Sequence, residues 1–164
     1  MNRFFASFVG GPGAVGLLVL RIVAGSGLML HGLPKIQNPF GWMDARGPSG
    51  VPGIFQFLAA FSEFFGGLAL IIGLLTPIAA LGVAFTMLVA AYMGHISKGD
   101  PFVNPPGRQG GSWELASIYF AISLLLMLVG PGALSLDALL FGKKQRGGRV
   151  IAGQTPEPAV AVSH

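Results

Sequence analysis

The sequence contains no cysteine and few charged residues. Without cysteine the chain can form no disulfide, thiolate nucleophile or cysteine-ligated metal centre, so any thiol chemistry would need a partner's sulfur. No heme, flavin or iron–sulfur site is evident either. Only 10% of the residues are charged, whereas soluble domains carry about 25%. With 52% hydrophobic residues and a mean hydropathy of +0.71, the composition indicates an integral membrane protein.

Four apolar segments are long enough to cross a bilayer. They cover about residues 13–33, 53–75, 77–96 and 113–130, and a hydrocarbon core of ~30 Å needs ~20 helical residues. The sequence therefore predicts an all-α fold, an integral membrane four-helix bundle formed by one domain over residues 1–142. We expect Pro34 to follow the first span. We also expect a short interfacial helix from Leu134 to Phe141, with Ser135 as its N-cap.

Basic residues are concentrated in the C-terminal tail. Residues 143–164 form a basic segment that we expect to be disordered. Four spans place both termini on one side of the membrane. That side carries five basic residues, whereas the two long loops on the other side, 34–52 and 97–112, carry four. This bias favours cytoplasmic termini. The tail is expected to contact anionic membrane lipid, and nucleic acid is not expected as a partner.

Two charged residues interrupt the predicted spans. Arg21 lies in the first and Glu63 in the second, each with uncharged residues on both sides. Charges inside a bilayer are costly and usually paired or functional. If the two helices run antiparallel over their full lengths, Arg21 lies roughly 18 Å and Glu63 roughly 15 Å below the outer surface. The sequence predicts a buried Arg21–Glu63 ion pair, with a structural or a functional role.

The same depth argument groups the polar residues near the outer ends of the spans. His31 and Lys35 end the first span, His95 ends the third, and Glu114 begins the fourth. We predict a polar pocket that opens outward above the ion pair. Its residues are Arg21, His31, Lys35, Glu63, His95 and Glu114.

Alternative interpretations remain for these residues. Lys35, His95 and Glu114 could simply mark the ends of spans, where polar residues are ordinary, and Glu114 also suits the dipole of a helix N-terminus. His31, His95 and Glu114 could form a two-histidine, one-carboxylate metal site, but no local spacing supports it. We therefore expect no metal, and no catalytic residue is assigned firmly.

Several sequence motifs resemble the DoxX family of small four-helix membrane proteins. The matching positions are Leu20, Arg21, Gly25, His31, Gly32 and Lys35, then Glu63 to Gly67, Gly73 and Thr76 to Ala80, then Met87, His95 and Glu114, and the closing run Gly130 to Asp137. The resemblance covers about residues 15–140. The order and spacing of these motifs are more specific than any single motif.

The resemblance implies a four-helix bundle in the bacterial cytoplasmic (inner) membrane. DoxX-like proteins resemble the membrane subunit of thiosulfate:quinone oxidoreductase, and others are linked to oxidative-stress complexes or to maturation of periplasmic enzymes. The family's recurrent polar positions map onto the six pocket residues named above. At most, then, the chain would be the membrane subunit of a quinone-linked oxidoreductase.

Three functions stay open from the sequence. The first is a redox-associated subunit that binds a quinone or similar amphiphile, with electrons supplied by a protein partner. The second is a non-catalytic assembly or anchoring subunit of a larger membrane complex or a homo-oligomer. The third is a small transporter, although no inverted repeat with broken helices is visible.

Overall fold

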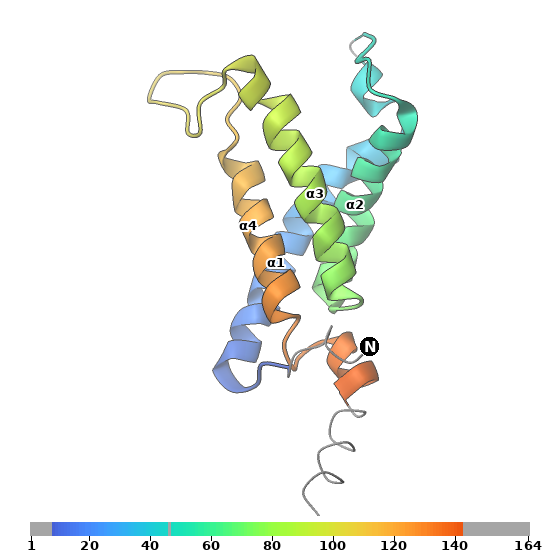
Figure 1. Cartoon of the computed structure of the whole chain (residues 1–164), viewed down its shortest axis with the longest axis vertical. Helices are drawn as coiled ribbons and strands as arrows, with labels where there is room; N and C mark the ends of the chain where they lie inside the picture. Colours follow the sequence, from blue (N-terminus) through green and yellow to red (C-terminus); the bar gives the residue numbers. More distant parts are fainter. Residues whose placement is uncertain (1–7, 46, 143–164) are drawn as a thin grey trace, which may run out of the picture.

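The computed structural model describes residues 8–45 and 47–142, which fold into an all-α bundle (Figure 1). The long helices are α1 (Gly11–Ile36), α2 (Gly53–Ile72), α3 (Thr76–Gly94) and α4 (Glu114–Val129). Two 3₁₀ turns, η1 (Trp42–Asp44) and η2 (Ile96–Lys98), lie in the long loops, and residues 136–142 are again helical. The all-α fold class predicted from the sequence is confirmed.

The outer surface of the bundle is apolar, as a membrane protein requires. Large hydrophobic side chains such as Val23, Leu30, Phe85 and Leu128 are exposed on it. Three helical segments are long and apolar enough to cross a membrane: α1, α2, and α3 together with η2. The fourth predicted span forms where expected, but α4 has only 16 residues. At 1.5 Å per residue it is roughly 24 Å long, shorter than a full hydrocarbon core.

Close contact between α1 and α2 depends on glycine. A Cβ atom added at Gly25 would lie 2.5 Å from the carbonyl oxygen of Gly67, and one at Gly32 would lie 2.6 Å from the backbone nitrogen of Phe64. Such small residues let two helix backbones approach without a hydrophobic driving force between them. These two contacts also fix the register of the antiparallel pair, with Gly25 opposite Gly67 and Gly32 opposite Phe64.

The first helix is longer than the sequence suggested. Pro34 does not end it, because α1 continues to Ile36 with the proline inside its last turn. A proline at this place removes one helical hydrogen bond, and a single loss near a helix end is tolerated. Lys35 is therefore held on the helix and not in the loop that follows. Figure 1 shows both long loops at one end of the bundle and residues 136–142 at the other.

The end of the bundle opposite the long loops is closed by residues 131–142. The Ser135 hydroxyl accepts a hydrogen bond from the backbone nitrogen of Ala138 (3.1 Å), so Ser135 caps the last helix as predicted. Asp137 is fully buried and accepts hydrogen bonds from the backbone nitrogens of Leu75 (2.7 Å) and Thr76 (2.9 Å). Its carboxylate thus satisfies free donors at the start of α3 and holds Leu75 in the left-handed region, at φ 48°.

Candidate functional site

A pocket of about 180 Å³ opens between the four long helices, near the end that carries the long loops. Its apolar wall consists of Leu28, Met87, Ala90, Leu115 and Ala116. Its polar wall consists of His31, Lys35, Glu63, His95, Ser112 and Tyr119. An apolar concavity with a few convergent polar groups is typical of sites for small molecules.

An ion pair between α1 and α2 forms one side of the pocket. The Lys35 ammonium lies 2.6 Å from both carboxylate oxygens of Glu63. The Glu63 side chain is only 3% exposed and that of Lys35 is 24% exposed. The carboxylate is therefore almost completely removed from solvent, and the ammonium is its charged partner.

The loop between α1 and α2 covers this ion pair. The Trp42 ring lies over the Lys35 ammonium, 4.6 Å from nitrogen to ring centroid, in cation–π contact. The Trp42 indole nitrogen donates to the carbonyl oxygen of Gln56 (2.9 Å), and the buried Gln56 side chain donates to the Asp44 carboxylate (2.8 Å). Asp44 also accepts hydrogen bonds from the hydroxyl and backbone nitrogen of Ser49. These bonds, led by the Ser49 hydroxyl, hold the pKa of Asp44 below its ordinary value.

His31 and Tyr119 meet across the pocket from α1 and α4. Their rings are edge-to-face, with centroids 6.4 Å apart. The Tyr119 hydroxyl packs directly against Gly27, where a Cβ atom would occupy its place. Glycine at position 27 therefore lets the phenol reach the pocket from the opposite helix.

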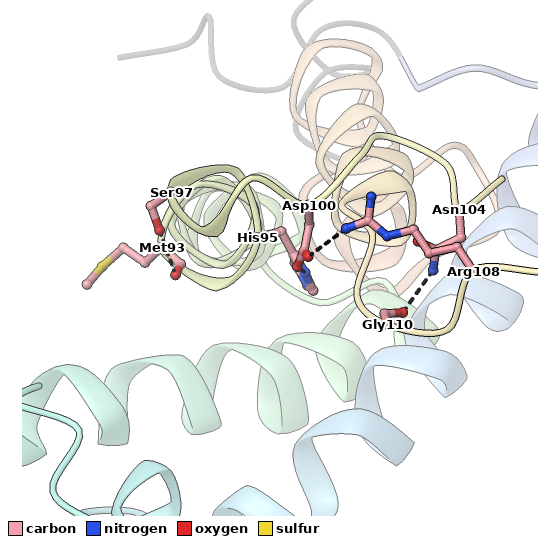
Figure 2. Close-up of polar contacts among 7 residues, drawn as sticks. All are labelled: Met93, His95, Ser97, Asp100, Asn104, Arg108 and Gly110. Carbon is pink, nitrogen blue, oxygen red and sulfur yellow. Dashed lines mark hydrogen bonds and ion pairs between the residues drawn. The ribbon is translucent and has the colours of Figure 1, made fainter.

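His95 closes the pocket at the end of α3. Its Nδ1 atom lies 2.9 Å from an oxygen of Asp100, in the loop that connects α3 to α4 (Figure 2). Arg108 approaches the other oxygen of the same carboxylate at 3.8 Å. The pocket is thus bordered by the Lys35–Glu63 ion pair between α1 and α2 and by the His95–Asp100 contact at the start of the α3–α4 loop.

Comparison with known proteins decides the family. The DoxX family model matches residues 16–96. The "Inner membrane protein YqjF" of Escherichia coli is 34% identical over 131 residues, which cover 77% of this chain and 92% of that protein. The chain belongs to the DoxX family.

Further relatives of this DoxX-family chain match most of its length. A Bacillus subtilis protein named "Putative oxidoreductase CatD" is 29% identical over 133 residues, covering 81% of this chain and 92% of that protein. A Haemophilus influenzae protein is 34% identical over 129 residues, covering 77% and 92%. No solved structure shows significant similarity to the chain.

The predicted ion pair between Arg21 and Glu63 does not form in the DoxX-family chain, because Glu63 pairs with Lys35 instead. Arg21 is fully buried, donates to the carbonyl oxygen of Leu134 and interacts electrostatically with Asp137. It packs against Gly73, at the end of α2. That position is ten residues from Glu63 along α2, roughly 15 Å of helix.

The cause of this error is the register of the first two helices. The prediction assumed that α1 and α2 start and end at the same levels. The glycine contacts shift α1 so that its first ten residues extend beyond the α2–α3 turn. The shift moves Arg21 out of the pocket and brings Lys35 to the level of Glu63.

Four of the six predicted pocket residues line one pocket: His31, Lys35, Glu63 and His95. Glu114 does not line it and instead begins α4, which fits the alternative interpretation as a helix N-terminal acid. The proposed metal set of His31, His95 and Glu114 is also not assembled. Within residues 8–45 and 47–142, no three histidine or acidic side chains lie close enough to share an ion.

The sequence prediction did not include Trp42 or Asp100 among the site residues. Both lie in loops, where helical spacing gives no information about contacts. A weak signal was available for Asp100. The glycine before it, Gly99, allows a tight turn that brings Asp100 back toward His95. For Trp42 the sequence carries no comparable signal.

Proposed function

We propose that this DoxX-family chain is a bacterial inner-membrane protein of a redox system, and that its pocket binds a quinone or a similar amphiphile. The observation that carries the proposal is one pocket that combines an apolar wall with the Lys35–Glu63 pair, two histidines and a tyrosine. The name of the relative YqjF supports the inner membrane. The name of the relative CatD supports a redox association.

The pocket fits the ring of such a ligand in size and chemistry. Its volume of about 180 Å³ is comparable with an engineered cavity of ~150 Å³ that binds benzene. Leu28 and Met87 would contact the faces or edges of a ring. The Tyr119 hydroxyl and the His95 imidazole are the polar groups that would hydrogen-bond ring oxygens.

The redox system would include a protein partner or a second copy of the chain. The chain has no cysteine, so thiol chemistry would have to come from elsewhere, as would the electrons for a quinone. In this proposal the chain binds the amphiphile and its partner carries the electron-transfer group. A chain that only assembled or anchored a complex would not need to bind the ligand, and a binding measurement separates these two roles.

The test uses the two tryptophans of the chain as reporters. Trp42 lies over Lys35, and Trp113 follows the pocket residue Ser112. We expect a short-chain alkyl benzoquinone to quench their fluorescence saturably in the purified chain in detergent. Tyr119→Phe should weaken binding about fivefold through the loss of one hydrogen bond.

The matched control is Tyr92→Phe, which makes the same chemical change on the outer face of α3, where Tyr92 is 63% exposed. It should leave the affinity unchanged. Quenching that does not saturate, or an equal loss of affinity in Tyr119→Phe and Tyr92→Phe, would contradict the proposed binding site. Saturable binding that both variants retain would place the ligand elsewhere on the protein.

A further inference from the structure

The loop that follows α3 folds His95 and Asp100 into a fixed pair. The imidazole Nδ1 lies 2.9 Å from the Asp100 carboxylate, and the Asp100 backbone nitrogen donates to the His95 carbonyl oxygen at 3.1 Å. Gly99 has a φ of 76°, a left-handed conformation that closes the turn between them. Backbone and side chain therefore connect the same two residues, as Figure 2 shows for the side chains.

Two neighbours fix the carboxylate in this pair. Arg108 approaches the Oδ1 atom of Asp100 at 3.8 Å and leaves Oδ2 to His95. Gly111 packs over the contact so closely that a Cβ atom there would lie 2.6 Å from both Asp100 Oδ2 and His95 Nδ1. The pair is thus enclosed by the loop on one side and faces the pocket with the imidazole on the other.

The geometry determines which nitrogen of a neutral His95 carries the proton. An ionised carboxylate only accepts hydrogen bonds, so Nδ1 must be the donor toward Asp100. The remaining nitrogen, Nε2, is then a hydrogen-bond acceptor and is the one left for a ligand in the pocket.

We propose that the Asp100–His95 pair makes the pocket selective for a ligand with a hydroxyl group, a hydroquinone or another phenol, over the corresponding quinone. A hydroxyl can donate to Nε2, whereas quinone oxygens can only accept. Asp100 acts through His95 and is a positioning residue. The proposal rests on the proposed function of the pocket and names the chemical class that it prefers.

The test compares a short-chain alkyl benzoquinone with its hydroquinone, without oxygen, at neutral pH, by tryptophan quenching of the full chain. We expect the wild type to bind the hydroquinone at least about fivefold more tightly, the worth of one hydrogen bond. In Asp100→Asn, Arg108 attracts the amide oxygen, so the amide nitrogen faces His95 and donates to Nδ1. Nε2 then becomes a donor, and the affinity ratio should fall to one or below.

Two further variants separate this role from loop stability. Gly111→Ala leaves the pair's chemistry intact but forces the two side chains apart, and should also reduce the ratio toward one. Asn104→Ala removes a hydrogen bond of the same loop, from Asn104 Nδ2 to the Gly110 carbonyl oxygen (2.8 Å), without touching the pair. It should keep the wild-type ratio even if both affinities fall.

The outcomes distinguish the two proposals. If neither the benzoquinone nor the hydroquinone binds, both the proposed function and this selectivity are wrong. If both rings bind the wild type equally, the pocket binds quinones but the selectivity is wrong. A wild-type ratio that persists in both Asp100→Asn and Gly111→Ala would also overturn the role of the pair.

Discussion

The charges of Lys35 and Glu63 should be strongly coupled in the stability of the protein. Lys35→Met would leave the Glu63 carboxylate, 3% exposed, without its cation. Breaking a buried ion pair in this way costs roughly 3–5 kcal/mol. We expect Lys35→Met to lower the free energy of unfolding by about 3 kcal/mol, the lower end of this range. Lys35 is a quarter exposed, and the unpaired Glu63 carboxyl can take up a proton.

A double-mutant cycle isolates the interaction. Glu63→Gln removes the other charge, and the double variant leaves no buried ion. The double variant should therefore lose less free energy of unfolding than the two single variants together, with a coupling energy of about 2 kcal/mol. The measurement is the free energy of unfolding in mixed micelles with increasing dodecyl sulfate, followed by circular dichroism. Lys98→Met, at an exposed lysine of η2, is the matched control and should have little effect.

A second cycle on Arg21 and Glu63 provides the contrast. Because Arg21 packs against Gly73 and not against Glu63, its cycle should be additive within about 0.5 kcal/mol. Strong coupling between Arg21 and Glu63, with additivity between Lys35 and Glu63, would refute both the pairing and the helix register from which it follows.

Other perturbations test the helix packing, the α3 cap and the loop between α1 and α2. Gly32→Ala should destabilise the bundle by about 1–3 kcal/mol in the same unfolding assay, because the α1–α2 contact leaves no room for a Cβ atom. Gly94→Ala, with open space around it, should be neutral or stabilising. Asp137→Ala should cost about 2 kcal/mol by uncapping α3; a neutral result would show that the cap is dispensable. The Asp44 pKa is lowered by Ser49, so this carboxylate stabilises the loop above its unfolded pKa of about 3.9. That contribution disappears as pH falls through the lower folded value. Trp42 fluorescence should report this acid transition, and Asp44→Asn should remove it.

The fold could be predicted because composition and segment length depend on physical limits. A membrane helix must be apolar over about 20 residues, and the predicted spans agree with α1 to α4 to within three residues at every end. Two details differ from the prediction. Pro34 lies inside α1 because the loss of one hydrogen bond in the last turn of a helix is tolerated, and α4 is shorter than a full span.

The site was only partly predictable because depth depends on helix register. His31, Lys35 and His95 were grouped at one end because they lie near span ends, whereas Glu63 lies ten residues inside its span and was paired with the wrong cation. Arg21 was misplaced because the sequence does not show that Gly25 and Gly32 shift α1 along α2. The loop contributions of Trp42 and Asp100 come from turn geometry, for which helical periodicity carries no information.

Photoaffinity labelling tests most directly whether the pocket binds a quinone. An azido-benzoquinone would be photolysed with the full chain in native membranes, and the labelled peptides mapped by mass spectrometry. The account predicts label on the segments 27–35 and 112–119, with loss of the label when unmodified benzoquinone is in excess. Label confined to the exposed face of α2, around Phe61 and Phe65, and not displaced by competitor would contradict it.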